Sequence, residues 1–390
     1  ECEIPVWHDD QQGTACVTLA GLINALKVVG RRIDDVEIAF IGSGAANVAI
    51  SRLIFAYGAD PAKCRIVDSK GILGKDRCDI EAVKDEWVDK WKYCSMTNAE
   101  GREGGIEEAL KGAHVCIALS RQGPDTILPE WIRGMASDPI VFLCANPIPE
   151  MWPWDAKEAG AAIVATGRSD FPNQVNNSVG FPGIFRGTLD VRARTITDEM
   201  CIAAAEELAK VAEDKGLSAD YIMPTMDDWE VFPREAAAVA MKAIEQGIAL
   251  RTDLTFEQEV AEATAIISRA RGMVQDQMAL GYIPMPEGSH APTPTKQAAK
   301  AAAKAAGDYA GELADRAVDA IGPTADKIAA AAQAAIDKAA EALKRASAGR
   351  KKGDGVEDAE VVAEEPPAWK PPDGDPEPPA GTGGAGTQDG

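Results

Sequence analysis

The chain has 390 residues, of which 46 % are hydrophobic, and this is enough for two domains or for one large domain with appendages. Its formal net charge of −22 argues against nucleic acid and anionic membrane surfaces as partners, because both require a basic protein face. No apolar run reaches the roughly 18 residues of a membrane-spanning helix, and Glu1 and Glu3 stand where a signal peptide would be basic, so we expect neither feature.

The eight cysteines are scattered along the chain, without a C-x-x-C pair or a histidine at zinc-binding spacing. Several lie within apolar runs, as in 115–119 and 141–145, where cysteine usually acts as a small buried hydrophobic residue. We therefore expect free thiols and a reducing, cytoplasmic compartment.

Residues 1–290 alternate short β-rich runs with helical patterns, which is typical of βαβ units and a parallel sheet. The expected strands are apolar almost throughout, as strands buried on both faces are: Glu37–Ile41, Arg65–Val67, Val115–Leu119, Ile140–Cys144 and Ala162–Ala165. The expected helices are Thr14–Gly30, Ala46–Tyr57, Glu130–Met135, Glu199–Asp214, Pro233–Gly247 and Thr255–Leu280. The prediction is an α/β fold with a doubly wound parallel sheet over about residues 34–167, flanked by helices.

Two further stretches follow the predicted globular domain of residues 1–290. Residues 291–350 begin as a Pro-rich linker and continue as an Ala/Lys-rich segment, for which we expect helix. This helix is either a solvated spacer or makes a weak helix–helix contact through a thin apolar stripe. Residues 351–390 are acidic and rich in proline and glycine, so they are expected to form a disordered tail.

A glycine-containing turn connects the strand expected at 37–41 with the next helix. Gly42 permits a tight turn, Gly44 lets the backbone approach a pyrophosphate, and the helix that follows points its free N–H groups at the anion. Asn47 stands where a third glycine or alanine is usual, and its side chain is expected to loosen the contact between helix and strand. The pattern predicts a dinucleotide-binding turn formed by Gly42, Ser43, Gly44, Ala45 and Ala46.

Asp68 ends the next expected strand, about twenty-five residues downstream, where a carboxylate can hold a ribose diol. The alternative is that Asp68 only caps a turn before Gly71. If it holds the ribose, its negative charge favours NAD over NADP, whose 2′-phosphate it would repel. Ser69 and Lys70 follow directly and soften that preference, so NADP stays open as the second choice.

Two adjacent carboxylates, Asp9 and Asp10, lie at the end of a short apolar run and just before a predicted helix. Because like charges repel, either both are solvated in a loop or a cation binds beside them. His8 precedes them, but a lone histidine is a poor basis for assigning a general base.

Four stretches resemble malic enzymes: I-P-V-W-H-D-D-Q-Q-G-T-A (4–15), the strand–glycine–helix unit (37–50), D-P-I-V-F-L-C-A-N-P-I-P-E (138–150) and A-T-G-R-S-D-F-P-N-Q-V-N-N-S-V-G-F-P-G-I-F-R-G (165–187). The resemblance extends from about Ile4 to Pro286 and is greatest to the bacterial and archaeal enzymes. It implies a Rossmann-like domain that takes part in the oxidative decarboxylation of malate to pyruvate and carbon dioxide. It also implies NAD or NADP as hydride acceptor and Mg²⁺ or Mn²⁺, which polarises the new carbonyl group.

The resemblance implies roles for individual residues. Asp10 matches a metal ligand, and Asp9 matches its neighbour in the active site. Asn146 and Asn177 match asparagines that hold malate beside the nicotinamide of the cofactor, and Ser120 lies in a loop that meets the cofactor. From the residues alone, an asparagine before proline and an asparagine in a loop are more often turn or capping residues.

Two positions depart from the family pattern, Gln12 in place of a frequent histidine and Arg121 in place of a small residue. Malic enzymes carry a domain ahead of the H-D-D motif that supplies a tyrosine acid, a lysine base and a Glu-Asp pair for the metal. Because the sequence begins at Glu1, we expect a fragment of a full enzyme, or one half of a split enzyme with a separate N-terminal domain, that oxidises malate poorly alone. The alternative is a non-catalytic dinucleotide-binding or assembly subunit. A homo-oligomer, a dimer or larger, is also expected.

Overall fold

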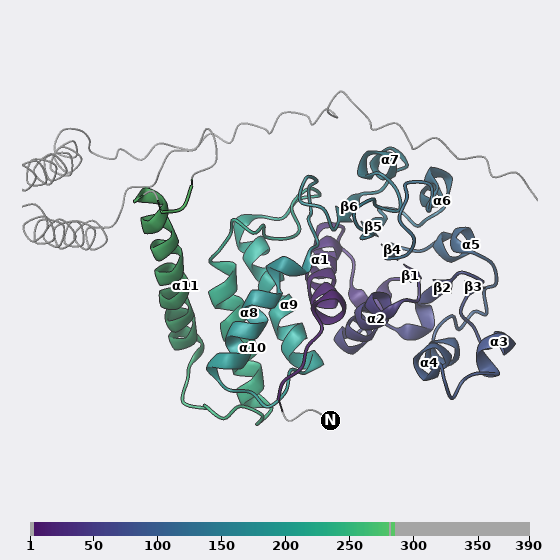
Figure 1. Ribbon diagram of the computed structural model, residues 1–390. Coiled ribbons are helices and arrows are strands. Elements are labelled where there is room, and N and C mark those ends of the chain that lie inside the picture. Colours follow the sequence, from purple (N-terminus) through teal and green to yellow (C-terminus); the bar gives the residue numbers. More distant parts are fainter. Residues whose placement is uncertain (1–3, 281, 285–390) are drawn as a thin grey trace, which may run out of the picture. The chain divides into compact units, whose positions relative to one another are not determined.

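A six-stranded sheet organises the first half of the computed structural model, which describes residues 4–280 and 282–284 (Figure 1). The strands lie in the order β3-β2-β1-β4-β5-β6, and all neighbours are parallel except β2 and β3. Their bounds are β1 Ile38–Ile41, β2 Arg65–Asp68, β3 Gly71–Ile72, β4 Val115–Ala118, β5 Ile140–Leu143 and β6 Ile163–Thr166. From β1 the chain first adds β2 and β3 on one side of the sheet, and then returns to add β4, β5 and β6 on the other side of β1. The predicted doubly wound parallel sheet is therefore confirmed, with β1 at its centre.

Successive residues of each strand enter two different hydrophobic cores, as the two-residue period of a strand requires. Phe40 and Phe142 face the larger core, which contains residues of α1, α2, α9 and α10. Ile41 and Leu143 face the smaller core, which contains residues of α5, α6 and α7. Helices therefore cover both faces, and this explains why the strands are apolar at nearly every position.

The helices have these bounds: α1 Thr14–Val28, α2 Ala45–Tyr57, α3 Cys78–Glu81, α4 Val88–Met96, α5 Ile106–Leu110, α6 Pro129–Arg133, α7 Pro153–Glu158, α8 Phe181–Asp190, α9 Asp198–Lys215, α10 Val231–Glu245 and α11 Phe256–Ala279. In the helical half, α10 packs against α8, α9 and α11, and α1 packs against both α9 and α2 (Figure 1). None of the helices in the described ranges is long and apolar enough to span a bilayer.

Several elements differ from the expectations. The segment Asp9–Gly13 is a π-helical turn that runs directly into α1, where a solvated loop was one of the two predictions. The short antiparallel strand β3 and the helices α3, α4, α5, α7 and α8 have no counterpart among the expected elements. The Ala/Lys-rich helix and the acidic tail predicted for 291–350 and 351–390 lie outside the described residues.

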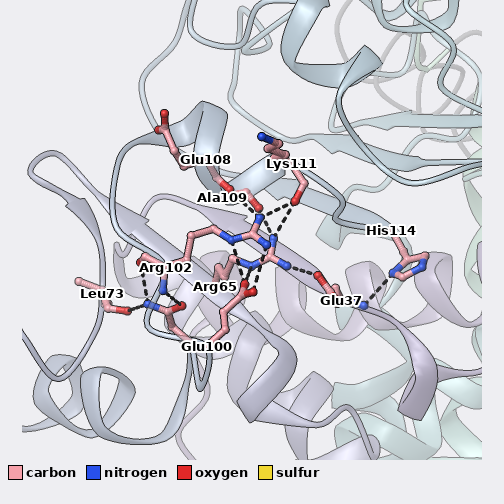
Figure 2. A network of polar contacts seen from close by, with 10 residues as sticks. Glu37, Arg65, Leu73, Glu100, Arg102, Glu108, Ala109, Lys111 and His114 are labelled. Atoms are coloured by element: carbon pink, nitrogen blue, oxygen red, sulfur yellow. Dashed lines mark hydrogen bonds and ion pairs between the residues drawn. The ribbon is translucent and has the colours of Figure 1, made fainter.

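A buried arginine braces the edge of the sheet where β2 begins. The side chain of Arg65 is only 2 % exposed and forms ion pairs with Glu37 and Glu100. It also donates to the carbonyl oxygen of Ala109 at 2.6 Å. Figure 2 shows the guanidinium groups of Arg65 and Arg102 together beside the carbonyl groups at the end of α5. Such carbonyls lack partners within their own helix, so the two cations hold α5 to the sheet.

Candidate functional site

The turn after β1 is built around Gly42, whose φ of +104° is unfavourable for any other residue. Its N–H donates to the carbonyl oxygen of Val67 at 2.9 Å, and a Cβ atom here would lie 2.5 Å from the carbonyl oxygen of Leu119. Gly44 precedes α2 and has open space where a side chain would point. Space beside a helix N-terminus, kept free by a glycine, fits the pyrophosphate of a dinucleotide.

Asn47 strengthens this turn, so the expectation that it would loosen the helix–strand contact was wrong. Its side chain is buried, and Nδ2 donates to the carbonyl oxygens of Ile41 and Gly42, at 3.0 Å each. These hydrogen bonds join the first turn of α2 to the end of β1, where a third glycine could only have provided close packing.

A pocket of about 440 Å³ opens between the ends of β1, β2 and β4, within the size range of small-molecule sites. Its lining includes Gly42, Ser43, Asp68, Ser69, Lys90 and Ser120. Four of the predicted cofactor residues, Gly42, Ser43, Asp68 and Ser120, therefore meet in one cavity, whereas Gly44, Ala45 and Ala46 are not in its lining. This donor set and shape fit the adenosine and pyrophosphate parts of a dinucleotide.

The carboxylate of Asp68 has four close donors. Oδ1 accepts from Nη1 of Arg77 at 3.0 Å and from the N–H of Lys70 at 2.9 Å. Oδ2 accepts from Nη2 of Arg77 at 3.0 Å and lies 2.7 Å from Nζ of Lys90. Burial alone would raise the pKa of Asp68, but the hydrogen bonds from Arg77 and Lys90 outweigh it and lower that pKa.

Glu150 joins the loop after β4 to the loop after β5, and the sequence did not single it out. This fully buried carboxylate accepts from the N–H of Ser120 at 2.8 Å and from the N–H of Ala145 at 3.1 Å. Burial raises its pKa, and the two N–H groups oppose that rise. Glu150 ends the N-P-I-P-E stretch, so its position in a family motif was the one available signal.

Asp9 and Asn177 come together although 168 residues separate them. Nδ2 of Asn177 donates to Oδ2 of Asp9 at 2.5 Å. The other oxygen, Oδ1, is buried without a hydrogen-bond partner among the described residues. It lies against Gly13, where a Cβ atom would come within 2.2 Å of it. Burial first, and next the charge of Asp10, raise the pKa of Asp9. The contact with Oδ2 therefore fixes the orientation of Asn177, whereas Oδ1 is enclosed by the protein.

Asn146 lies on the same edge of the sheet, in the loop after β5. A Cβ atom on Gly167 would lie 2.9 Å from its Nδ2. The carbonyl oxygen of Gly167 in turn accepts from Nδ2 of Asn176 at 3.1 Å, and Oδ1 of Asn176 accepts from the N–H of Ser178. Asn176 therefore orients its loop and places Asn177 beside Asp9. Gly167 and Asn176 connect Asn146 to this pair, and none of the three predicted substrate residues lines the pocket that contains Asp68.

A complete metal site does not form within the described residues. No group of three or more histidine, cysteine, aspartate or glutamate side chains in residues 4–280 and 282–284 could hold a metal ion. Asp10 is exposed and Asp9 is half-buried. Two carboxylates are fewer ligands than Mg²⁺ or Mn²⁺ requires, so the metal-binding role of Asp10 stays a prediction.

Comparison with known proteins identifies a family for this chain. The family described as malic enzyme, NAD-binding domain, matches residues 11–246. The chain is 46 % identical over 266 residues to the bifunctional malic/malolactic enzyme of Bacillus subtilis. The aligned region covers 68 % of this chain and 62 % of the relative. It is 40 % identical to the NAD-dependent malic enzyme of Geobacillus stearothermophilus (65 % and 51 % covered) and equally to the NADP-dependent malic enzyme of Halomonas elongata (64 % and 60 % covered).

Solved structures agree with the sequence relatives. The crystal structure of the malic enzyme of Entamoeba histolytica superimposes with a TM-score of 0.71 at 53 % sequence identity, covering 73 % of this chain and 59 % of that protein. The chain thus spans little more than half the length of the relatives it matches. The family match covers the sheet, the residues that line the pocket and Asn177. The chain therefore belongs to the malic enzyme family, and residues 11–246 correspond to the NAD-binding domain of that family.

Proposed function

We propose that the protein containing this chain oxidises malate and decarboxylates it to pyruvate and carbon dioxide, transferring the hydride to NAD or NADP. The observation that carries the proposal is that the glycine turn and the Asp9–Asn177 pair lie along one edge of the sheet. The names of the curated relatives support the same reaction.

Residues at one end of that edge would bind the cofactor, and residues at the other end would bind malate. The turn formed by Gly42, Ser43, Gly44, Ala45 and Ala46 would hold the pyrophosphate, because these residues surround the open N-terminus of α2. Ser120 would contact the middle of the cofactor from the loop that Glu150 fixes. Asp9, Asn146 and Asn177 would bind malate beside the nicotinamide.

Asp9 is the residue of this group with the most specific chemistry. Its Oδ2 holds the amide of Asn177, and this contact fixes the orientation of that side chain for the binding of malate. Binding of Mg²⁺ or Mn²⁺ by Asp10 belongs to the same proposal. The remaining ligands would come from the substrate or from outside the described residues.

The test measures binding and turnover separately. Titration of the full chain with NADH and NADPH, followed by fluorescence, tests the glycine turn, and binding of neither would contradict the proposal. Formation of one pyruvate and one carbon dioxide per NAD(P)H, with malate, Mn²⁺ and a matching N-terminal domain supplied in trans, tests the reaction. Asp9→Asn should lower this turnover about 10²-fold or more while leaving dinucleotide affinity unchanged. Tight dinucleotide binding with no response to malate when that domain is supplied would favour the non-catalytic alternative.

Two further properties belong to the proposal. The cysteines described by the structure, Cys16, Cys64, Cys78, Cys94, Cys116, Cys144 and Cys201, are all unpaired, which supports a reducing, cytoplasmic location. Assembly into a dimer or a larger homo-oligomer is tested by light scattering of the purified protein.

A further inference from the structure

The carboxylate of Asp68 has no lone pair left for a ribose. A carboxylate offers about four acceptor positions, and Arg77, Lys70 and Lys90 occupy one or two each, at 2.7–3.0 Å. To hold the 2′- and 3′-hydroxyl groups of NAD, Asp68 would have to release at least one charged donor. The carboxylate that would select NAD by binding its ribose is therefore already occupied by donors from the protein itself.

The charge around Asp68 is positive rather than negative. Asp68 and Asp79 are the two carboxylates of a set of linked ion pairs that also contains the three cations Lys70, Arg77 and Lys90. The side chain of Asp68 is 6 % exposed, whereas that of Lys90 is 24 % exposed and that of Lys70 is 67 % exposed. Of the two charged members of this set that line the pocket, the ammonium group of Lys90 is therefore more accessible to a ligand than the carboxylate of Asp68.

The ammonium group of Lys90 has a fixed position and is able to bind an anion. Its Nζ is fixed between Oδ2 of Asp68, at 2.7 Å, and the ring of Trp87, whose centroid is 5.0 Å away. An ammonium group has three donors, and Asp68 is its one hydrogen-bond acceptor among the described residues. Lys90 lines the pocket together with Ser69, whose hydroxyl group can also donate.

We propose that this end of the pocket selects a dinucleotide with a phosphate group on the 2′-oxygen of its adenosine, so that NADP(H) is preferred over NAD(H), with Lys90 and Ser69 as the recognising residues. The inference rests on the proposed function in one respect, that the pocket takes a dinucleotide. Asp68 is then a positioning residue that holds Lys90 and Arg77 at the end of β2. The preference is opposite to the one expected from Asp68 in the sequence alone.

The experiment is an equilibrium titration of the full chain with NADPH and with NADH, at two salt concentrations. NADPH should bind at least about tenfold more tightly, because a hydrogen bond to a charged group is worth more than one to a hydroxyl group. The advantage should shrink at high salt, since it depends on a phosphate charge. NADH binding as tightly as NADPH overturns the inference and leaves the proposed function intact, whereas binding of neither contradicts the proposed function itself.

The variants locate the selectivity. Lys90→Gln should reduce the affinity for NADPH about tenfold or more and leave that for NADH nearly unchanged. Lys90→Arg should retain the preference. Lys92→Gln, an exposed neutralisation on the same helix, is the matched control and should change neither affinity. An unchanged NADPH preference in a folded Lys90→Gln variant, or an equal loss in Lys92→Gln, would overturn the assignment. Thermal melting of each variant establishes that it is folded.

Discussion

The N–H of Ser120 donates to Oε1 of the buried Glu150 at 2.8 Å, and this contact connects two loops that the chain separates by 30 residues. The second oxygen of Glu150 accepts from the N–H of Ala145, one residue before Asn146. One carboxylate therefore fixes the loop that lines the cofactor pocket and the loop that carries a predicted malate ligand. Glu150 touches neither ligand in the proposed function and acts through the backbone.

Glu150→Gln should loosen both loops, because an amide has one acceptor oxygen and its NH₂ group would face one of the two N–H donors. We expect a loss of about 1–3 kcal/mol in the free energy of unfolding and a weaker dinucleotide affinity. Urea denaturation and NADPH titration measure the two effects. Glu158→Gln, an exposed change on α7, is the control. An unaltered affinity in a destabilised Glu150→Gln variant would show that the residue supports the fold alone.

Two glycines of the same turn should respond differently to alanine. Gly42→Ala would require a positive φ and would place Cβ 2.5 Å from the carbonyl oxygen of Leu119, so it should cost about 1–3 kcal/mol of stability. Gly44→Ala projects into open space at a φ of −73°, so it should leave the melting temperature unchanged and still weaken dinucleotide binding by obstructing the phosphate. If Gly44→Ala binds NADPH as well as the unmodified chain, the pyrophosphate does not lie at this turn.

Features that depend on neighbouring residues could be predicted from the sequence, whereas contacts between distant residues could not. The five parallel strands follow from short apolar runs bounded by turns, and Gly42 follows from its place between a strand and a helix, which are properties of neighbouring residues. The bounds moved by one or two residues because ladder hydrogen bonds, not apolarity, decide where a strand ends. The position of Asp68 was predictable, but its partners are Arg77, which directly precedes α3, and Lys90 of α4, and no local pattern specifies where these two helices are placed.

The same reasoning explains the residues that the sequence did not reveal. A glutamate such as Glu150 reads as an exposed charge until the fold shows two N–H groups converging on it. The Asp9–Asn177 contact needs α8 and its preceding loop to return to the start of α1, and the signal for it was a family motif rather than periodicity. Such long-range polar contacts can be identified only when the topology of the chain is known.

The Arg65 cluster should matter for stability and not for ligand binding. Arg65→Met removes a buried cation from Glu37 and Glu100 and takes away the arginine donor of the Ala109 carbonyl oxygen, so it should cost about 3 kcal/mol. Arg32→Met, which breaks an exposed pair with Asp34, should change stability little. Because Arg65 begins β2 and Asp68 ends it, NADPH affinity should be retained. Equal stability of the two variants in urea would contradict this account.

Docking of α11 should weaken as the pH rises. Glu259 of α11 is fully buried, and neither carboxylate oxygen has a hydrogen-bond partner by geometry. Burial first, then Asp190 at the end of α8, and then Glu262 raise the pKa of Glu259, and Arg186 opposes them. The folded state therefore retains a proton that the unfolded chain releases near its usual pKa of about 4.5. Its contribution to stability is complete below that pH and is lost as the pH rises toward the higher pKa of the folded state.

Glu259→Gln supplies a permanently neutral side chain of the same shape and should remove this dependence. Between about pH 5 and pH 8, the unmodified chain should lose stability relative to the variant, and the difference should grow with pH until the raised pKa of Glu259 is passed. Denaturation in urea at several pH values measures the difference, and hydrogen exchange of the α11 amides shows whether that helix opens first. Glu257→Gln, an exposed change on the same helix, should show the same pH dependence of stability as the unmodified chain. If Glu259→Gln also showed that pH dependence, Glu259 would be ionised in the folded protein across this range, and the contact between α8 and α11 would be insensitive to pH.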